Sequence, residues 1–166
     1  MYTLHPDTTR IADNLCVTEY GISFLNLMKN AAKSCYDYII SRTEKGEKIV
    51  VLCGKGNNGG DGYELSSLLG KGGFDVTVIN VFDCEPNTDT AKQVYFECIE
   101  NGVSVLSLND CKTALEKADV IIDSLFGVGF YGSVEKDSEI GKLLDFCNNK
   151  KCCIGKRWWT QDFLKT

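Results

Sequence analysis

From Lys48 onward, short apolar runs alternate with longer amphipathic stretches. Four runs rich in β-branched residues predict buried strands: Lys48–Cys53, Val76–Phe82, Ser104–Leu108 and Val120–Ser124. The stretches that follow them have helical spacing and predict helices: Gly60–Gly70, Thr88–Asn101, Lys112–Lys117 and Lys136–Asn148. Repeated strand–helix–strand units with short loops predict a Rossmann-like, doubly wound α/β fold. This is a three-layer α/β/α arrangement, with a mainly parallel sheet and helices on both faces.

The segment before Lys48 has helical periodicity instead. Apolar residues recur at helical spacing from Ile22 to Ile39, Gly21 interrupts the pattern, and Ser23 is a suitable N-cap. The whole chain, 1–166, is expected to form a single domain with three parts: leading helices over 1–47, a β/α core over 48–155 and an atypical tail over 156–166.

Composition narrows the class of protein. A chain of 166 residues can bury about 70% of its unfolded surface around one core. The net charge of −5 argues against nucleic acid as a partner. No apolar run approaches the roughly 20 residues that cross a bilayer. The polar start, Met1–Asp13, does not resemble a secretory signal, so we expect a cytoplasmic protein without a membrane partner.

The cysteines favour neither a metal site nor a disulfide framework. The chain has nine cysteines with no C-x-x-C pair among them, and its single histidine is His5. One histidine near the terminus also argues against a Ser-His or Cys-His catalytic pair. We expect the following cysteines to be reduced and mostly buried: Cys16, Cys35, Cys53, Cys84, Cys98, Cys111, Cys147, Cys152 and Cys153.

A glycine-rich segment after the first strand is the most informative feature of the chain. Between Gly54 and Gly62 there are five glycines within nine residues, followed by a predicted helix. A strand, a glycine turn and a helix start together present backbone N–H groups and a helix dipole to an anion. Glycine also permits positive φ and the close approach of a phosphate. The alternative is a tight turn without a ligand, which the interleaved Asn57, Asn58 and Asp61 argue against.

The same segment matches the dinucleotide fingerprint, Gly54-x-Gly56-x-x-Gly59. Asp83 follows the second strand, where a ribose-binding acid would stand. The segment does not end in Gly-Lys-Ser/Thr, so Lys55 is not the lysine of a nucleoside triphosphatase.

A second glycine-rich segment follows the fourth predicted strand. Asp123 stands at the carboxyl end of that strand, before the turn Gly127-x-Gly129-x-x-Gly132. Ligand crevices of open α/β sheets lie outside the carboxyl ends of strands, so both glycine segments and Asp123 are expected to meet at one crevice. The alternative role for Asp123 is to cap a local turn. Its position within the strand end favours the crevice.

These residues resemble the NAD(P)H-hydrate epimerase family, the YjeF N-terminal domain. Cys53–Gly62, with its Asn-Asn-Gly-Gly-Asp-Gly element, resembles the phosphate loop of that family. Asp123–Gly132 resembles its Asp-Ala-Leu-Phe-Gly-Thr-Gly loop, with Ser124 and Val128 as small departures.

The resemblance extends from Ile11 to Asn148. It includes Glu19–Ile22 and Leu27–Ala31, which resemble the leading helices of the family, where Glu commonly stands at the position of Lys29. It implies an isomerase of nicotinamide cofactor repair, which interconverts the R and S forms of hydrated NADH and NADPH (NADHX and NADPHX). It further implies a separate NAD(P)HX dehydratase acting downstream, and a homodimer.

The resemblance also implies roles for individual residues. Asp123 would be the acid/base, and Asn58 and Asp123 would bind a potassium ion. Whether Asp123 acts on a proton or only holds the cation stays open. Substrate would be bound by residues of both glycine segments: Asn57, Asn58, Gly59, Gly60, Asp61, Gly127, Val128, Gly129, Phe130, Tyr131 and Gly132.

The C-terminal part departs from the family pattern. A strand begins at Lys151–Gly155, but the Asp-x-Pro-Ser-Gly turn of the family is absent; Pro6 and Pro86 are the only prolines. We expect a truncated reading frame or a frameshift near Gly155, with impaired epimerase activity; the alternative is a natural variant with a short C-terminal helix. Two other functions stay open: a non-catalytic nucleotide-binding or interaction module, and an NAD-dependent oxidoreductase, which the missing hydride-site histidine argues against.

Overall fold

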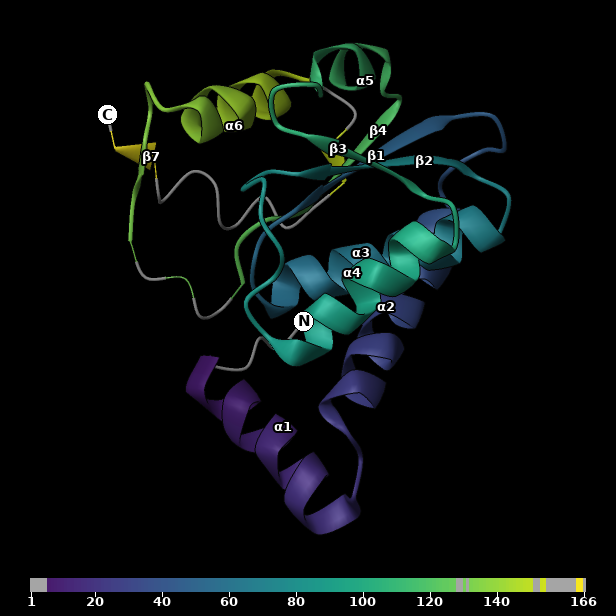
Figure 1. The fold of residues 1–166 in the computed structure, drawn as a ribbon, viewed down its shortest axis with the longest axis vertical. Helices are drawn as coiled ribbons and strands as arrows, with labels where there is room; N and C mark the ends of the chain where they lie inside the picture. The colour runs from purple at the N-terminus through teal and green to yellow at the C-terminus, as the bar shows by residue number, and fades with distance from the viewer. Residues whose placement is uncertain (1–5, 128–129, 131, 151–152, 155–163, 166) are drawn as a thin grey trace.

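The computed structural model describes residues 6–127, 130, 132–150, 153–154 and 164–165 (Figure 1). In chain order the elements are α1 (Pro6–Tyr20), α2 (Phe24–Ile40), β1 (Lys48–Cys53), α3 (Asn57–Lys71), β2 (Asp75–Asn80), α4 (Asp89–Glu100), β3 (Ser104–Ser107), α5 (Lys112–Lys117), β4 (Val120–Ser124), β5 (Val134–Glu135), α6 (Glu139–Asn149), β6 (Cys153–Ile154) and β7 (Leu164–Lys165).

The main sheet has the strand order β3-β2-β1-β4-β6, and all of its pairs are parallel. The chain builds β1, β2 and β3 outward on one side, then crosses back to place β4 on the other side of β1. The central strand β1 is buried from Ile49 to Cys53, as an apolar run flanked by strands on both sides should be. The predicted doubly wound α/β fold is confirmed.

Helices cover both faces of this sheet (Figure 1). On one face α2, α3 and α4 enclose a core that includes Met28, Tyr63 and Val94. On the other face α5 and α6 enclose a core that includes Leu115 and Leu143. These are the two apolar layers of a three-layer fold.

Several predicted elements are confirmed in detail. The bounds of β1, β4 and α5 agree with the sequence analysis. Gly21 has φ +66° and separates α1 from α2, and the Ser23 side chain caps α2 by accepting the N–H of Asn26. Lys29 on α2 pairs with Glu97 on α4 at 3.0 Å, so the lysine at this position joins two helices.

Two predicted helices begin elsewhere. α3 starts at Asn57 rather than Gly60, because the glycines of the segment form its first turns. α6 starts at Glu139 rather than Lys136, since Val134–Glu135 is a short strand and Ser138 then caps the helix.

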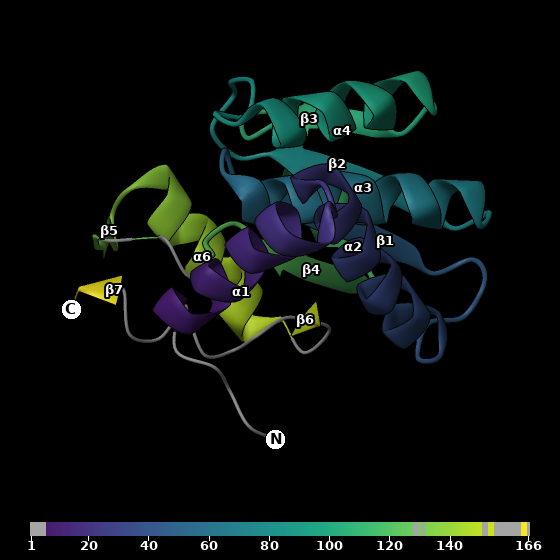
Figure 2. The ribbon, with the colours of Figure 1, turned by 90° about the horizontal axis from the view of Figure 1, so that it is seen from below.

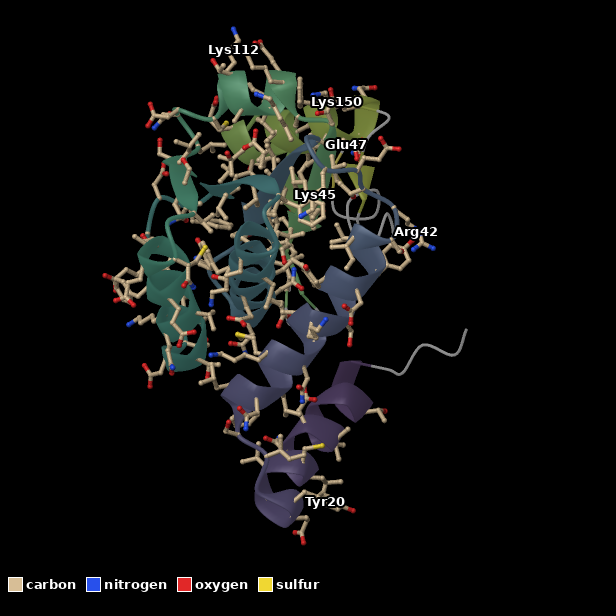
Figure 3. The ribbon with its side chains drawn as sticks, turned by 90° about the vertical axis from the view of Figure 1, so that its right-hand side faces the viewer. Tyr20, Arg42, Lys45, Glu47, Lys112 and Lys150 are labelled. Atoms are coloured by element: carbon tan, nitrogen blue, oxygen red, sulfur yellow. The ribbon has the colours of Figure 1, made fainter. Side chains whose placement is uncertain are left out.

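Helix α1 lies on the outside of the helical layer (Figure 2). Of the described helices and strands, α2 is its main packing partner. Ile11 and Leu15 on α1 are 60% and 49% exposed, and Tyr20, at the tip, is 77% exposed. Figure 3 shows Tyr20 at the end of the molecule farthest from Lys112.

The loop before β1 is fastened to its surroundings. Lys45 Nζ donates to the Gly72 carbonyl and lies 3.7 Å from the centre of the Phe74 ring. The N–H of Lys48 donates to Asp119 Oδ2 at 2.9 Å. Figure 3 shows Lys45 on this side of the molecule, between Arg42 and Lys150.

The described part of the C-terminal region is extended. Cys153–Ile154 forms β6 beside β4, within the strand expected at 151–155, and Leu164–Lys165 pairs with β5 as a strand. Gly155, where the frameshift was expected, and most of the tail lie outside the described residues. Within the segments that the structure describes, no helix has both the length and the apolar character that a bilayer-spanning helix requires.

Candidate functional site

The two glycine-rich segments leave neighbouring strands at the same edge of the sheet. β1 ends at Cys53 and β4 at Ser124, and these two residues are register partners. The Gly54 N–H donates to the Ser124 carbonyl at 3.1 Å, which continues the pairing into the loops. The strand order reverses between β1 and β4, and such a switch point is where open α/β sheets bind ligands. The structure therefore brings both predicted segments together.

Hydrogen bonds join the first segment to the second. Ser124 Oγ donates to the Asn58 carbonyl at 2.6 Å, and Asn58 Nδ2 donates to the Phe126 carbonyl at 3.3 Å. A Cβ added to Gly127 would lie 3.1 Å from the Asn58 Cβ, so these loops are in contact. Ser124 stands out in the sequence only as a departure from the family pattern, but in the structure its hydroxyl links the two loops.

The glycines of the first segment serve close packing. A Cβ on Gly59 would lie 1.9 Å from the Gly54 carbonyl oxygen, and one on Gly62 would lie 2.7 Å from Cys53 Sγ. None of the five glycines between 54 and 62 has a positive φ, so of the two properties that glycine offers, the fold uses close approach here. Side chains at these positions would push α3 away from the strand ends. Their absence lets the first N–H groups of α3, which lack intrahelical acceptors, lie at the carboxyl edge of the sheet.

A third loop, between β2 and α4, adjoins the first segment. The Asn87 N–H donates to the Lys55 carbonyl at 2.7 Å, and Thr88 Oγ1 donates to Asn57 Oδ1 at 2.6 Å. This contact between the two loops could not be predicted from the sequence, because Thr88 indicated only the start of a helix. Asp83, the expected ribose-binding acid, has φ +49°, and its Oδ1 accepts the Leu108 N–H at 3.1 Å, so one carboxylate oxygen binds the loop after β3.

Two carboxyl groups at this edge hold their protons unusually tightly. Burial, and to a lesser degree the charge of Asp13 on α1, raises the pKa of Asp61 to about 7. Burial also raises the pKa of Asp123, partly offset by a hydrogen bond from the Leu125 N–H to Asp123 Oδ1 at 3.0 Å. Asp123 therefore does hold a local turn, the alternative role, while keeping one oxygen outside that bond. With a pKa of about 7, Asp61 can exchange a proton near neutral pH, and the raised pKa of Asp123 favours its protonated form.

The second segment is described in part. The Phe130 N–H donates to the Gly127 carbonyl at 3.0 Å, closing a turn, and Gly132 is exposed. The predicted site residues Val128, Gly129 and Tyr131 lie outside the described residues.

The described side chains hold no group of three His, Cys, Asp or Glu residues that could bind a metal ion. The structure describes the side chains of seven cysteines, and four of them are buried: Cys53, Cys98, Cys111 and Cys147. Cys16 is partly buried, whereas Cys35 and Cys84 are exposed. A cation at this edge would therefore depend on amide, carboxylate and carbonyl oxygens, a donor set that suits hard cations.

Comparison with known proteins identifies relatives over most of the chain. The family described as "YjeF-related protein N-terminus" matches residues 25–155. NAD(P)H-hydrate epimerase of Legionella pneumophila (strain Corby) is 35% identical over 137 residues, covering 79% of this chain and 50% of the relative. NAD(P)H-hydrate epimerase of Elusimicrobium minutum is 30% identical over 145 residues, covering 82% of this chain and 66% of the relative.

Longer proteins are also similar. The bifunctional NAD(P)H-hydrate repair enzyme Nnr of Dictyoglomus turgidum is 30% identical over 142 residues, covering 84% of this chain and 26% of the relative. The chain spans about half the length of the first curated relatives it matches. The crystal structure of the yeast protein ynu0 (YNL200c) superposes with a TM-score of 0.76 at 24% identity, covering 93% of this chain and 68% of that one, which supports the fold.

Proposed function

Because the chain belongs to the family of YjeF-related protein N-termini, we propose that it is an NAD(P)H-hydrate epimerase, an isomerase that interconverts the R and S forms of NADHX and NADPHX. Relatives with that name are 30–35% identical over most of the chain. The observation that carries the proposal is the junction of the two glycine segments, where the start of α3 adjoins the strand that bears Asp123.

We assign substrate binding to both segments. The start of α3, Asn57–Asp61, would bind the phosphates and a ribose, because its free N–H groups and helix dipole favour an anion. Gly127–Gly132 would enclose the ligand from the β4 side. The Asn58 hydrogen bond to Phe126 supports this arrangement, since it fixes one segment against the other.

We assign the acid/base role to Asp123. The reacting carbon of the hydrate bears a hydroxyl group and adjoins the ring nitrogen, so epimerisation needs no net oxidation. The nitrogen lone pair can expel the hydroxyl group as water once that group gains a proton, and water can return to the other face while losing one. Asp123, with its raised pKa, would donate the first proton and accept the second.

A potassium ion fits the oxygen donors at this edge. Asn58 and Asp123 would hold it, because an amide oxygen and a single carboxylate suit a hard cation of low charge. When bound, the ion would supply positive charge beside the substrate. The relatives named bifunctional repair enzymes support a repair sequence, and we propose that a separate NAD(P)HX dehydratase acts downstream. The homodimer and the cytoplasmic location stay predictions.

The test is epimerisation of R-NADPHX by the purified chain in potassium buffer, coupled to an S-specific dehydratase. We expect turnover above the spontaneous rate. Asp123→Asn should lower it by about 100-fold or more, because a positioned acid/base contributes roughly 10²–10⁴-fold. Asp145→Asn, at an exposed position on α6, should leave it unchanged.

Near-normal turnover by folded Asp123→Asn protein would remove Asp123 from the mechanism. No turnover by the folded parent chain would contradict the epimerase proposal. In that case, retained binding of ADP-ribose would favour the nucleotide-binding module.

A further inference from the structure

Three phenylalanine rings form a continuous row at the carboxyl edge of the sheet. Phe82 follows β2, whereas Phe126 and Phe130 follow β4. The ring centres of Phe82 and Phe126 are 6.3 Å apart at an interplanar angle of 76°, and those of Phe126 and Phe130 are 4.1 Å apart at 38°. We call these three side chains the phenylalanine row. It connects loops from strands on opposite sides of β1.

The phenylalanine row lies beside the first glycine segment. The Val81 N–H donates to the Cys53 carbonyl at 3.2 Å, so the chain enters Phe82 next to the end of β1. Lys55, an exposed residue of the glycine segment, places its Nζ 5.3 Å from the centre of the Phe82 ring. All three rings pack against the core under α5 and α6, yet each remains partly exposed. Aromatic surface is therefore open to solvent within the candidate site.

We propose that the phenylalanine row is the subsite for the adenine ring of the dinucleotide, which stacks on Phe82. This inference rests on the proposed function. Aromatic side chains stack with planar, fully conjugated bases. The hydrated nicotinamide ring has tetrahedral carbons and is not planar, so adenine is the part of the substrate that suits such a surface. Neither Phe82 nor Phe126 belongs to the binding residues expected from the sequence.

The topology supports this orientation. Phe82 follows β2 and Asp123 lies near the carboxyl end of β4, with β1 and the start of α3 between them. A dinucleotide whose pyrophosphate lies on the start of α3 would therefore extend its adenine toward Phe82 and its reacting ring toward Asp123. The cation–π contact of Lys55 with Phe82 is exposed and therefore weak, so the ammonium group can move to a phosphate when the base stacks.

The test compares the binding of AMP, nicotinamide mononucleotide and ribose 5-phosphate to the full chain by calorimetry. Ribose 5-phosphate has the sugar and phosphate of AMP without the base. We expect AMP to bind at least about fivefold more tightly, the lower end of what base stacking contributes. Phe82→Leu keeps the apolar volume and should abolish this advantage, leaving ribose 5-phosphate binding unchanged. Phe82→Trp should retain it.

Phe146→Leu is the matched control. Phe146 on α6 is also partly exposed, with Lys150 Nζ 5.7 Å from its ring centre, but it lies between α5 and α6 rather than at the carboxyl edge. It should change the binding of none of the three ligands. This comparison separates loss of a solvent-exposed ring from loss of the proposed subsite.

Three results would overturn the inference. The first is that AMP does not bind to the parent chain, and the second is an AMP advantage that survives in folded Phe82→Leu protein. The third is that Phe82→Leu weakens the binding of nicotinamide mononucleotide alone. Epimerisation assayed on the same variants keeps the two proposals apart. AMP binding through Phe82 without turnover would contradict only the epimerase. Turnover without a Phe82-dependent AMP advantage would contradict only the adenine subsite.

Discussion

Asp61 and Asp123 are both acids whose protons are held by burial, but their surroundings differ. Asp123 accepts a backbone N–H, which stabilises its charged form and limits the rise in its pKa. Asp61 has the negative Asp13 facing it from α1, which raises its pKa further. Asp61 is therefore the group whose charge should most affect the stability of the fold near neutral pH.

The sign of that effect follows from the two pKa values. The ordinary pKa of an aspartate is 3.8, and that of Asp61 in the folded chain is about 7. Between these values the folded chain keeps a proton that the unfolded chain releases, so this carboxyl group lowers the free energy of unfolding as pH rises from about 4 to about 7.

Asp61→Asn should remove this dependence. The amide stays neutral, so the variant should be more stable than the parent at pH 8, by about 1–2 kcal/mol after allowance for solvent screening at a partly exposed site. Near pH 4 the two should be alike. Thermal unfolding of both proteins across this range measures the difference. Asp145→Asn, on the exposed side of α6, should show no such pattern; a pH-independent difference for Asp61→Asn would contradict the shifted pKa.

At the scale of elements, the sequence predicted correctly those strand bounds and helix caps that depend only on neighbouring residues. The bounds of β1 and β4 follow from apolar runs that are buried on both faces, and the Ser23 cap follows from a side chain acting three residues away. The start of α3 could not be predicted in this way. Glycine is a poor helix former, and the reason for Gly59 is the carbonyl of Gly54, a contact that exists only in the folded loop.

The residues of the candidate site likewise fall into those that local sequence patterns predicted and those that they did not. The two glycine segments and Asp123 were found because each follows a strand, and parallel strands end at one edge. Thr88 and Phe82 were not, because nothing near them in the sequence shows that the loop after β2 contacts the loop after β1. Ser124 could not be recognised as a link between loops, since its partner Asn58 is 66 residues away.

Gly59→Ala tests the packing of α3 on the strand ends. In an exposed helix alanine would stabilise, but here its Cβ would overlap the Gly54 carbonyl, so we expect a loss of about 2 kcal/mol or more. Gly56→Ala is the matched control, because nothing lies within 4 Å of a Cβ at that position and its φ is −100°. It should cost less than about 1 kcal/mol. Urea unfolding of the two variants checks this, and equal losses would refute the packing argument.

At the scale of the whole molecule, α1 is the element least integrated into the fold. Among the described elements its main packing partner is α2, and its apolar residues Ile11 and Leu15 are exposed. Helices with little buried apolar surface open locally at low free energy. The charge of Asp13 on α1 nevertheless contributes to the raised pKa of Asp61. Motion of α1 would therefore change the charge of Asp61 at the candidate site.

Amide hydrogen exchange should therefore divide the molecule. We expect peptides from α1 to take up deuterium much faster than peptides from α3, whose Leu65 and Leu69 are buried. Mass spectrometry of peptides after a series of labelling times makes the comparison. Equal protection of the two helices would show that α1 is covered in solution by a surface absent from the single chain.

The position of β1 between β2 and β4 also affects how the protein is made. β2 emerges from the ribosome soon after β1, but the stretch from Cys53 to Val120 takes roughly 3–13 s at about 5–20 residues per second. Throughout that interval the most apolar strand of the nascent chain has an open edge. Any codon change that slows translation between α3 and α5 would lengthen this exposure, so the yield of folded protein should depend on the speed of synthesis as well as on the amino-acid sequence.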